Sequence, residues 1–477
     1  MRKKGSVTVF LTLILSLLLS LICASIESVR MASARTQILN GMDIGLYSLF
    51  GQYDKELLAD YDLFALDGSR GGGQLDLAAV CDELEAYMNP VLKQNSQKLT
   101  LCQSGLTGYR LLTDQNGEAF YQQIVGYMQE TLGSQGIQLL LGRMSERQEK
   151  TAQADQSANQ AQSKGSIDRY DSEMNQASEK SQQAAEEAQV VPQAPPAKNP
   201  ITIMKRIMKR GVLELVLPGG NGLSTKEIEK GTLVSGRGLQ QGMEMPDGMT
   251  VENSYTSEVL FQQYLMEHLG SYAEPSSTGL AYQVEYIFGG KDSDEDNLKA
   301  VASKLLFIRE GVNFACLMAD NVKRSEAQAL ATAIASGFLV PPAAVIIEAA
   351  LILCWAFAES VLDVRELFAG GRIPLVKSSG DWQISLENLP DLMEGLDSMR
   401  RNDEKGMSYK DYLQVLVLTV SKEKKVMRAM DMIENTIREK GRKNFCMDSC
   451  IVALEAFADV KANKKKDFQV IRQYCYE

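Results

Sequence analysis

The sequence VTVFLTLILSLLLSLICASI, residues 7–26, decides the fold at the N-terminus because it contains twenty consecutive uncharged residues. At about 1.5 Å per residue, an α-helix of this length spans roughly 30 Å, the hydrocarbon thickness of a bilayer. A basic cluster, Arg2, Lys3 and Lys4, precedes the run. The positive-inside rule therefore predicts a cytoplasmic N-terminus. Residues 1–30 are expected to form a leader and transmembrane anchor, with the bulk of the chain outside the cytoplasm.

A cleaved signal peptide is the alternative interpretation of this segment. The apolar core of a signal peptide spans about 7 to 15 residues and is followed closely by a small-x-small cleavage site. The candidate site, Ala32-Ser33-Ala34, lies beyond the charged residues Glu27 and Arg30. We therefore expect the segment to be retained, which predicts a single-pass protein of the cell membrane.

Small or hydroxylated residues recur at every fourth position of the anchor. In lipid, helices associate through close backbone approach, which small residues at i and i+4 permit. The hydroxyl groups can instead bond to carbonyl groups of their own helix. Both interpretations are open. The candidate helix-packing seam, for self-association or for contact with other envelope subunits, consists of Thr12, Ser16, Ser20, Ala24 and Ser28.

The anchor helix is expected to continue past the membrane as a stalk. An apolar stripe at helical spacing supports this continuation and consists of Ile38, Met42, Gly45 and Leu49. Farther along, residues 75–92 and 118–132 have helical patterns, whereas residues 100–112 have the alternation of a β-strand. We therefore predict that residues 31–144 form the stalk and a small α+β domain.

A change of composition separates this region from the rest of the chain. Residues 145–200 are rich in Gln, Ala, Ser and Glu, which predicts a polar low-complexity spacer. Residues 201–477 predict a mainly helical C-terminal domain. Within it, residues 212–218 are a strand candidate and residues 446–460 have helical spacing. The predicted fold class is α+β and predominantly helical.

A second strongly apolar run covers residues 337–358 and contains Pro341, Pro342 and a single charge at Glu348. Two apolar helices joined at the proline pair predict a buried hairpin over residues 325–362. A second membrane span is the alternative, although a charge in the middle of a span is costly in lipid.

Three polar residues of this apolar region are candidates for a buried site. Glu348 and Glu359 lie in or beside the most apolar helix, and a buried carboxyl group is either neutral or paired with a cation. Arg365 is the candidate cation. One interpretation is that an ion pair of these residues specifies the fold. The other is that they take part in proton or ligand chemistry.

The remaining sequence predicts no catalytic residues, no cofactor and no metal site. His268 is the only histidine, and no Gly-x-Ser-x-Gly string occurs. Seven cysteines lie outside the anchor. The alternatives for them are buried thiols, one or two disulfides, or a metal site. Residues 292–297 resemble a calcium loop but lack its glycine and final glutamate, so they predict an acidic helix N-terminus. The net charge of −11 disfavours nucleic acid as a partner.

Residues 3–13, KKGSVTVFLTL, resemble the start of the TadE/TadG-like proteins of tight-adherence pilus systems. These proteins have a short basic leader, a Gly-Ser junction and an apolar helix. Such segments usually carry a glutamate near the fifth position after the junction, where this chain has Phe10. Cleavage at Gly5 is therefore not expected, and incorporation into a filament is less expected than for a true pilin.

Several longer strings are similar to the DUF5702 family of uncharacterised proteins. They are NGMDIGLYSLF (40–50), YDLFALD (61–67), EYIFGG (285–290), REGVNF (309–314) and WAFAESVLDVR (355–365). The resemblance implies an envelope protein and brings no catalytic residues. The expected function is that of a membrane-anchored extracytoplasmic structural or accessory protein of a pilus or secretion assembly. An envelope ligand-binding or sensor module and an envelope enzyme of unknown reaction are the alternatives.

Overall fold

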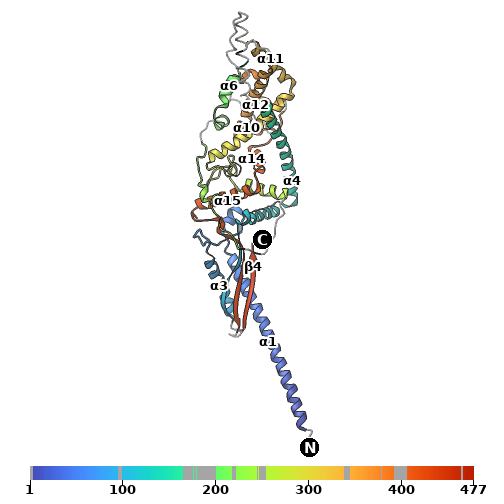
Figure 1. Cartoon of the computed structure of the whole chain (residues 1–477), viewed down its shortest axis with the longest axis vertical. Helices are drawn as coiled ribbons and strands as arrows, with labels where there is room; N and C mark the ends of the chain where they lie inside the picture. The colour runs from blue at the N-terminus through green and yellow to red at the C-terminus, as the bar shows by residue number, and fades with distance from the viewer. Residues whose placement is uncertain are drawn as a thin grey trace. The chain divides into compact units, whose positions relative to one another are not determined.

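The chain is mostly helical, and the part of it that the structure describes contains one small antiparallel sheet (Figure 1). The computed structural model describes residues 4–94, 99–164, 176, 179, 200–217, 222–243, 245, 254–337, 344–377, 379–391, 406–462 and 466–476. These residues form two compact units. The first combines Met1–Tyr127, Gly231–Glu252 and Ile437–Glu477, and the second combines Met128–Lys230 and Asn253–Thr436.

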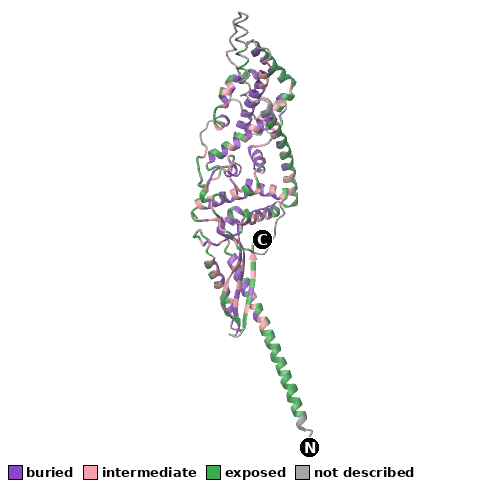
Figure 2. Cartoon of the chain, viewed as in Figure 1, coloured by how far each residue is buried: buried purple, intermediate pink, exposed green. Residues whose placement is uncertain are grey.

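The first unit begins with α1 (Lys4–Phe50), a single continuous helix. Its apolar side chains from Val7 to Val29 are exposed, whereas its later turns carry buried side chains (Figure 2). The buried side chains follow helical spacing and are Ala34, Ile38, Met42, Leu46, Leu49 and Phe50. The predicted continuation of the helix past the apolar run is thus confirmed as far as Phe50.

The sheet of the first unit is built around a strand from near the end of the chain. Its strands are β1 (Leu66–Asp67), β2 (Leu99–Leu111), β3 (Cys450–Ala462) and β4 (Lys466–Cys475). β3 is antiparallel to the other three, and Leu99 of β2 pairs with Ala462 while Leu111 pairs with Ile451. The predicted strand at residues 100–112 is therefore confirmed as β2.

The prediction of a helix over residues 446–460 is wrong, because residues 450–462 form β3. Alanine, leucine and glutamate in this segment favour a helix. Every second side chain is nevertheless buried: Leu454, Ala456, Ala458, Val460 and Ala462. Strands on both sides satisfy the backbone, so pairing and burial override the helix propensity.

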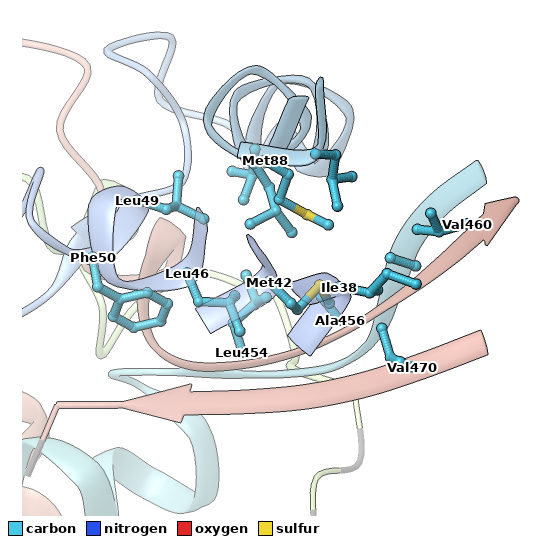
Figure 3. Packing of buried hydrophobic residues seen from close by; sticks show 14 of the residues in the cluster. Ile38, Met42, Leu46, Leu49, Phe50, Met88, Leu454, Ala456, Val460 and Val470 are labelled. Carbon is cyan, nitrogen blue, oxygen red and sulfur yellow. The ribbon is translucent and has the colours of Figure 1, made fainter. Parts of the chain in front are cut away.

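The helix α1 and one further helix form the core of the first unit together with the sheet. α2 (Lys55–Tyr61) follows α1, and α3 (Leu77–Lys93) confirms the helix predicted at residues 75–92. α1 and α3 pack against each other and against the sheet, with Met88 of α3 and Leu454 of β3 lining the same core as Met42 (Figure 3). A Cβ atom at Gly45 would lie 2.6 Å from Cγ of Met88, so the glycine permits this close approach.

The helix predicted at residues 118–132 belongs to the longer α4 (Asp114–Lys164). Its first turn is left-handed, since Gln115, Asn116 and Gly117 have positive φ angles. The first twenty residues of the predicted spacer, 145–164, are part of α4. Apart from residues 176 and 179, the spacer from residue 165 to residue 199 lies outside the described residues.

The second unit is built from helices. Besides the later part of α4, they are α6 (Pro200–Met208), α7 (Val212–Val216), α8 (Tyr255–His268), α9 (Gln283–Gly289), α10 (Asp294–Ala319), α11 (Asn321–Gly337), α12 (Ala344–Phe368) and α14 (Tyr409–Leu418), with most of α15 (Lys422–Glu439) and the short η3 (Ser379–Asp381) and η4 (Leu386–Asp391).

The predicted strand at residues 212–218 is wrong, because Val212–Val216 form the helix α7. A short apolar run does not distinguish a strand from a buried helical turn. Leu215 and Val216 are buried, and α7 packs against α10 and α12.

The apolar hairpin predicted over residues 325–362 corresponds to α11 and α12, which pack against each other. Pro341 and Pro342 lie outside the described residues. Nearly all side chains of α12 from Ala350 to Phe368 are buried. This burial agrees with a core hairpin.

Candidate functional sites

Two features of the chain are candidate functional sites. In the first part of α1, apolar side chains are exposed, and in a cluster elsewhere in the chain, charged side chains are buried. Within the described residues, two helices are long and apolar enough to cross a membrane, α1 and α12. In α12, 78% of the most apolar window is buried, whereas in α1 none of it is. Only α1 therefore presents such a surface to its surroundings, and this surface suits the interior of a bilayer.

The hydroxyl groups of the proposed packing seam make hydrogen bonds within α1. Thr12 donates to the carbonyl oxygen of Val9 at 2.9 Å, and Ser16 and Ser20 donate to the carbonyl oxygens three residues earlier at 2.9 and 2.8 Å. These bonds satisfy the donors inside the helix, so the residues act sterically as small side chains. Ala24 and Ser28 are exposed on the same helix.

The buried cluster lies in the second unit and joins α10, α12 and the loop that follows α12. Arg309 donates to Oδ2 of Asp363 through Nε at 3.0 Å and through Nη2 at 2.9 Å. Lys377 Nζ lies 2.5 Å from Oε1 of Glu359 and 2.5 Å from Oδ1 of Asp363. All four side chains are 0–3% exposed. Two cations thus neutralise two carboxylates away from water.

Neutral groups complete the hydrogen bonding of this ion cluster, which is Arg309, Glu359, Asp363 and Lys377. Asn313 donates to Oδ2 of Asp363 at 3.0 Å, and the backbone N–H of Ile384 donates to Glu359 at 3.1 Å. Burial alone would raise the pKa of Asp363, but the charges of Arg309 and Lys377 outweigh burial and hold this pKa below its ordinary value. The carboxylate of Asp363 is therefore stabilised by the two cations that contact it.

The structure gives each predicted buried polar residue a partner. Glu359 belongs to the ion cluster. Glu348 of α12 lies 3.7 Å from Nη2 of Arg324 in α11, so this partly exposed pair links the two helices of the hairpin. Arg365, the predicted cation, donates to the carbonyl oxygen of Leu215 in α7 at 3.1 Å.

A second buried polar centre surrounds Glu285 of α9. Tyr409 donates to Oε1 of Glu285 at 2.7 Å, and the N–H of Tyr272 donates to the same oxygen at 2.8 Å. The other oxygen, Oε2, has no hydrogen-bond partner among the described residues. Burial raises the pKa of Glu285 to about 7 despite these two bonds. Burial also raises the pKa of Glu310 to about 7.

The acidic residues Asp294, Glu295 and Asp296 lie in the first turn of α10, at the helix N-terminus that the sequence predicts. Ser293 accepts a hydrogen bond from the N–H of Asp296, and Asp294 accepts from the N–H groups of Ala281 and Tyr282. All eight cysteines lie within the described residues and none of them forms a disulfide; Cys354 and Cys450 are buried. Within the described residues, no group of three His, Cys, Asp or Glu side chains is placed to hold a metal ion.

Sequence reasoning found Glu359 but missed Arg309, Asp363 and Lys377. A usable signal existed, because Arg309 and Asn313 are one helical turn apart, as are Glu359 and Asp363. These residues also lie in the strings 309–314 and 355–365 that resemble the DUF5702 family. Lys377 lies in a loop without a recognisable pattern, so nothing in the sequence pointed to it.

Comparison with known proteins gives one match. A family described as "Family of unknown function (DUF5702)" matches residues 192–462, more than half of the chain. The matched region includes the ion cluster and β3, whereas the similar strings at 40–50 and 61–67 precede it. No curated protein and no solved structure matches the chain.

Proposed function

The chain belongs to DUF5702, a family of unknown function, and we propose that it is a membrane-anchored structural or accessory protein of the cell envelope. One observation carries the proposal. α1 is a single helix whose first part is apolar and exposed and whose later part is built into the core of the first unit. A helix of this kind inserts into a bilayer and holds a folded unit at the surface without an intervening linker.

The location of the charged groups supports a structural role over catalysis. The ion cluster is 0–3% exposed, so no substrate touches it. Its hydrogen bonds hold α10, α12 and the loop after α12 together. A cluster that specifies the fold is expected to link separate segments in this way. By the positive-inside rule, the N-terminus lies in the cytoplasm and both units lie outside it.

We further propose that the partners are other envelope subunits of a pilus or secretion assembly. The small side chains of the seam support close packing of α1 with a second helix in lipid. Chemical crosslinking of the full-length protein in membranes, with identification of its neighbours, tests this proposal. Pilus or secretion subunits among the crosslinked proteins are expected, and their absence from repeated experiments would contradict the assembly role.

Membrane insertion is tested by carbonate extraction of membranes that contain the full-length chain. We expect the wild type to remain in the membrane pellet. The double variant Leu15→Arg and Leu18→Arg should be released, because each central arginine costs about 2.5–3.5 kcal/mol on insertion scales. Ile44→Arg is the matched control, since Ile44 is an exposed apolar residue of α1 beyond the apolar run. A wild-type chain recovered in the soluble fraction would refute insertion.

Sidedness is tested separately with a maleimide that does not cross membranes. Cys102 of β2 is exposed, so it should be labelled in intact cells if the first unit lies outside the cytoplasm. The Cys102→Ser variant identifies the labelled site. Labelling of Cys102 only after the cells are lysed would place the first unit in the cytoplasm.

A further inference from the structure

One end of the sheet lies beside the turn of α1 that directly follows the apolar run. β3 and β4 are consecutive strands, and at this end Ala462 pairs with Lys466. Nζ of Lys466 lies 3.6 Å from Oε1 of Glu27 and also contacts the sulfur of Met31. Glu27 directly follows the apolar run. The end of the β3–β4 pair is therefore level with the turn of α1 that leaves the apolar segment (Figure 1).

This position fixes the depth of Lys466 relative to a bilayer. If residues 7–26 fill the hydrocarbon core, Glu27 and Met31 lie about 2 and 8 Å beyond it along the helix axis. The headgroup layer on each side of a bilayer is about 5–8 Å thick. The ammonium group of Lys466 therefore lies at the depth of the lipid phosphates.

We propose that Lys461, Lys466 and Arg30 form a binding surface for the phosphate groups of anionic phospholipids. The inference rests on the proposed insertion of α1. The lipids are those of the leaflet through which the C-terminal end of the apolar run leaves the membrane. Lys461 of β3 is next to Ala462, so its side chain lies at the same end of the β3–β4 pair as Lys466 but on the opposite face. Arg30 is exposed on α1 between the two residues that Lys466 contacts.

The acidic neighbours do not saturate these cations. Lys461 is 49% exposed and lies 3.6 Å from Asp467, and Lys466 is 45% exposed in its pair with Glu27. Exposed pairs of this kind contribute little in water. Each ammonium group also has three donors, so it can bind a phosphate oxygen while keeping its carboxylate partner.

The consequence for the protein is an orienting contact. A single transmembrane helix leaves the attached unit free to rotate about the helix axis. Phosphate contacts on one side of α1, at the end of the β3–β4 pair, hold that side of the first unit against the membrane surface.

Hydrogen exchange of the full-length protein in lipid nanodiscs tests the surface. We compare discs of phosphatidylcholine with discs that contain phosphatidylglycerol, and follow peptides from residues 454–462 and 466–476. Exchange should be about fivefold slower in the anionic discs, the factor expected for one lysine near a charged surface, and high salt should remove the difference. The double variant Lys461→Gln and Lys466→Gln should lose the difference, whereas Lys461→Arg and Lys466→Arg should keep it.

The control is Lys55→Gln, because Lys55 is exposed in the first unit beyond the other end of α1. The proposed binding surface would be refuted if the wild type exchanged at the same rate in both kinds of disc. It would also be refuted if the double glutamine variant kept the slower exchange in anionic discs. Equal protection in phosphatidylcholine discs with added inorganic phosphate would show that free phosphate, and not lipid, is the ligand. Failure of the protein to enter nanodiscs at all would refute the proposed function instead.

Discussion

Removing Lys377 should destabilise the second unit more than removing both Lys377 and Glu359. Lys377→Met leaves two buried carboxylates, Glu359 and Asp363, with the single cation Arg309. Breaking a buried ion pair in this way costs about 3–5 kcal/mol. Adding Glu359→Gln restores the charge balance and keeps an oxygen that can accept the backbone N–H bonds. The double variant should therefore recover about half of the loss or more.

The two tryptophans of the chain report on this region directly. Trp355 donates to the carbonyl oxygen of Ile384 at 2.7 Å, and its ring lies 5.8 Å from that of Trp382. The ring of Trp382 is in turn 5.6 Å from Nζ of Lys377. Urea unfolding of the full chain in detergent micelles, followed by tryptophan fluorescence, therefore measures the stability of the unit that contains the cluster. With a slope of about 3 kcal/mol/M, the midpoint of Lys377→Met should fall by about 1–2 M.

Lys410→Met is the matched control, because Lys410 pairs with Glu274 at the surface, where the two side chains are 34% and 73% exposed. Exposed pairs contribute about 0–1 kcal/mol, so the midpoint should move little. A double variant that is less stable than Lys377→Met would refute the charge-balance argument. A midpoint of Lys377→Met that equals the wild-type value would refute the structural role of the cluster.

Three further predictions concern packing and ionisation. Gly45→Leu should lower stability by about 1–3 kcal/mol in thermal unfolding, since α3 leaves no room for a side chain, whereas Gly126→Ala, where space is free, should be neutral or stabilising. Because the pKa of Glu285 rises from 4.5 to about 7 on folding, its stabilising contribution is complete below pH 4.5 and is lost as the pH rises through 7. Urea midpoints at pH 5 and pH 8 should therefore differ less in Glu285→Gln than in the wild type, and an equal difference would contradict this. Burial raises the pKa of Cys354 to about 12, so iodoacetamide should modify Cys102 but not Cys354 in the folded protein, as read by mass spectrometry.

The elements that the sequence predicted correctly have local signals. The apolar run, the stripe of Ile38 and Met42, and the alternation of residues 100–112 depend on periodicity within about a dozen residues. β3 has the alternation of a strand as well, but its alanines and glutamates favour a helix. The partner strand β2 is about 350 residues earlier in the chain. A prediction from one segment cannot include a partner strand that is so distant in the sequence. The helix propensity of the segment was therefore given more weight than its strand-like alternation.

The ion cluster shows a second limit of local reasoning. Glu359 was recognised because a carboxylate in an apolar helix requires a partner. The identity of that partner depends on the loop after α12, which brings Lys377 to the carboxylate. Arg365 was the nearest cation in the sequence, but its side chain extends to α7. Spacing along a helix predicts which face a residue occupies and does not predict which loop covers that face.

The central position of β3 has a consequence for the order of biosynthesis. The helices α1 and α3 are made before β3 and β4, although all four elements enclose the stripe of Ile38, Met42 and Leu46. Until the ribosome has delivered residues 450–475, α3 covers only one side of that stripe, so the nascent first unit exposes apolar side chains of α1. A chaperone that shields these side chains would act only on newly made chains, before β3 and β4 pack over them.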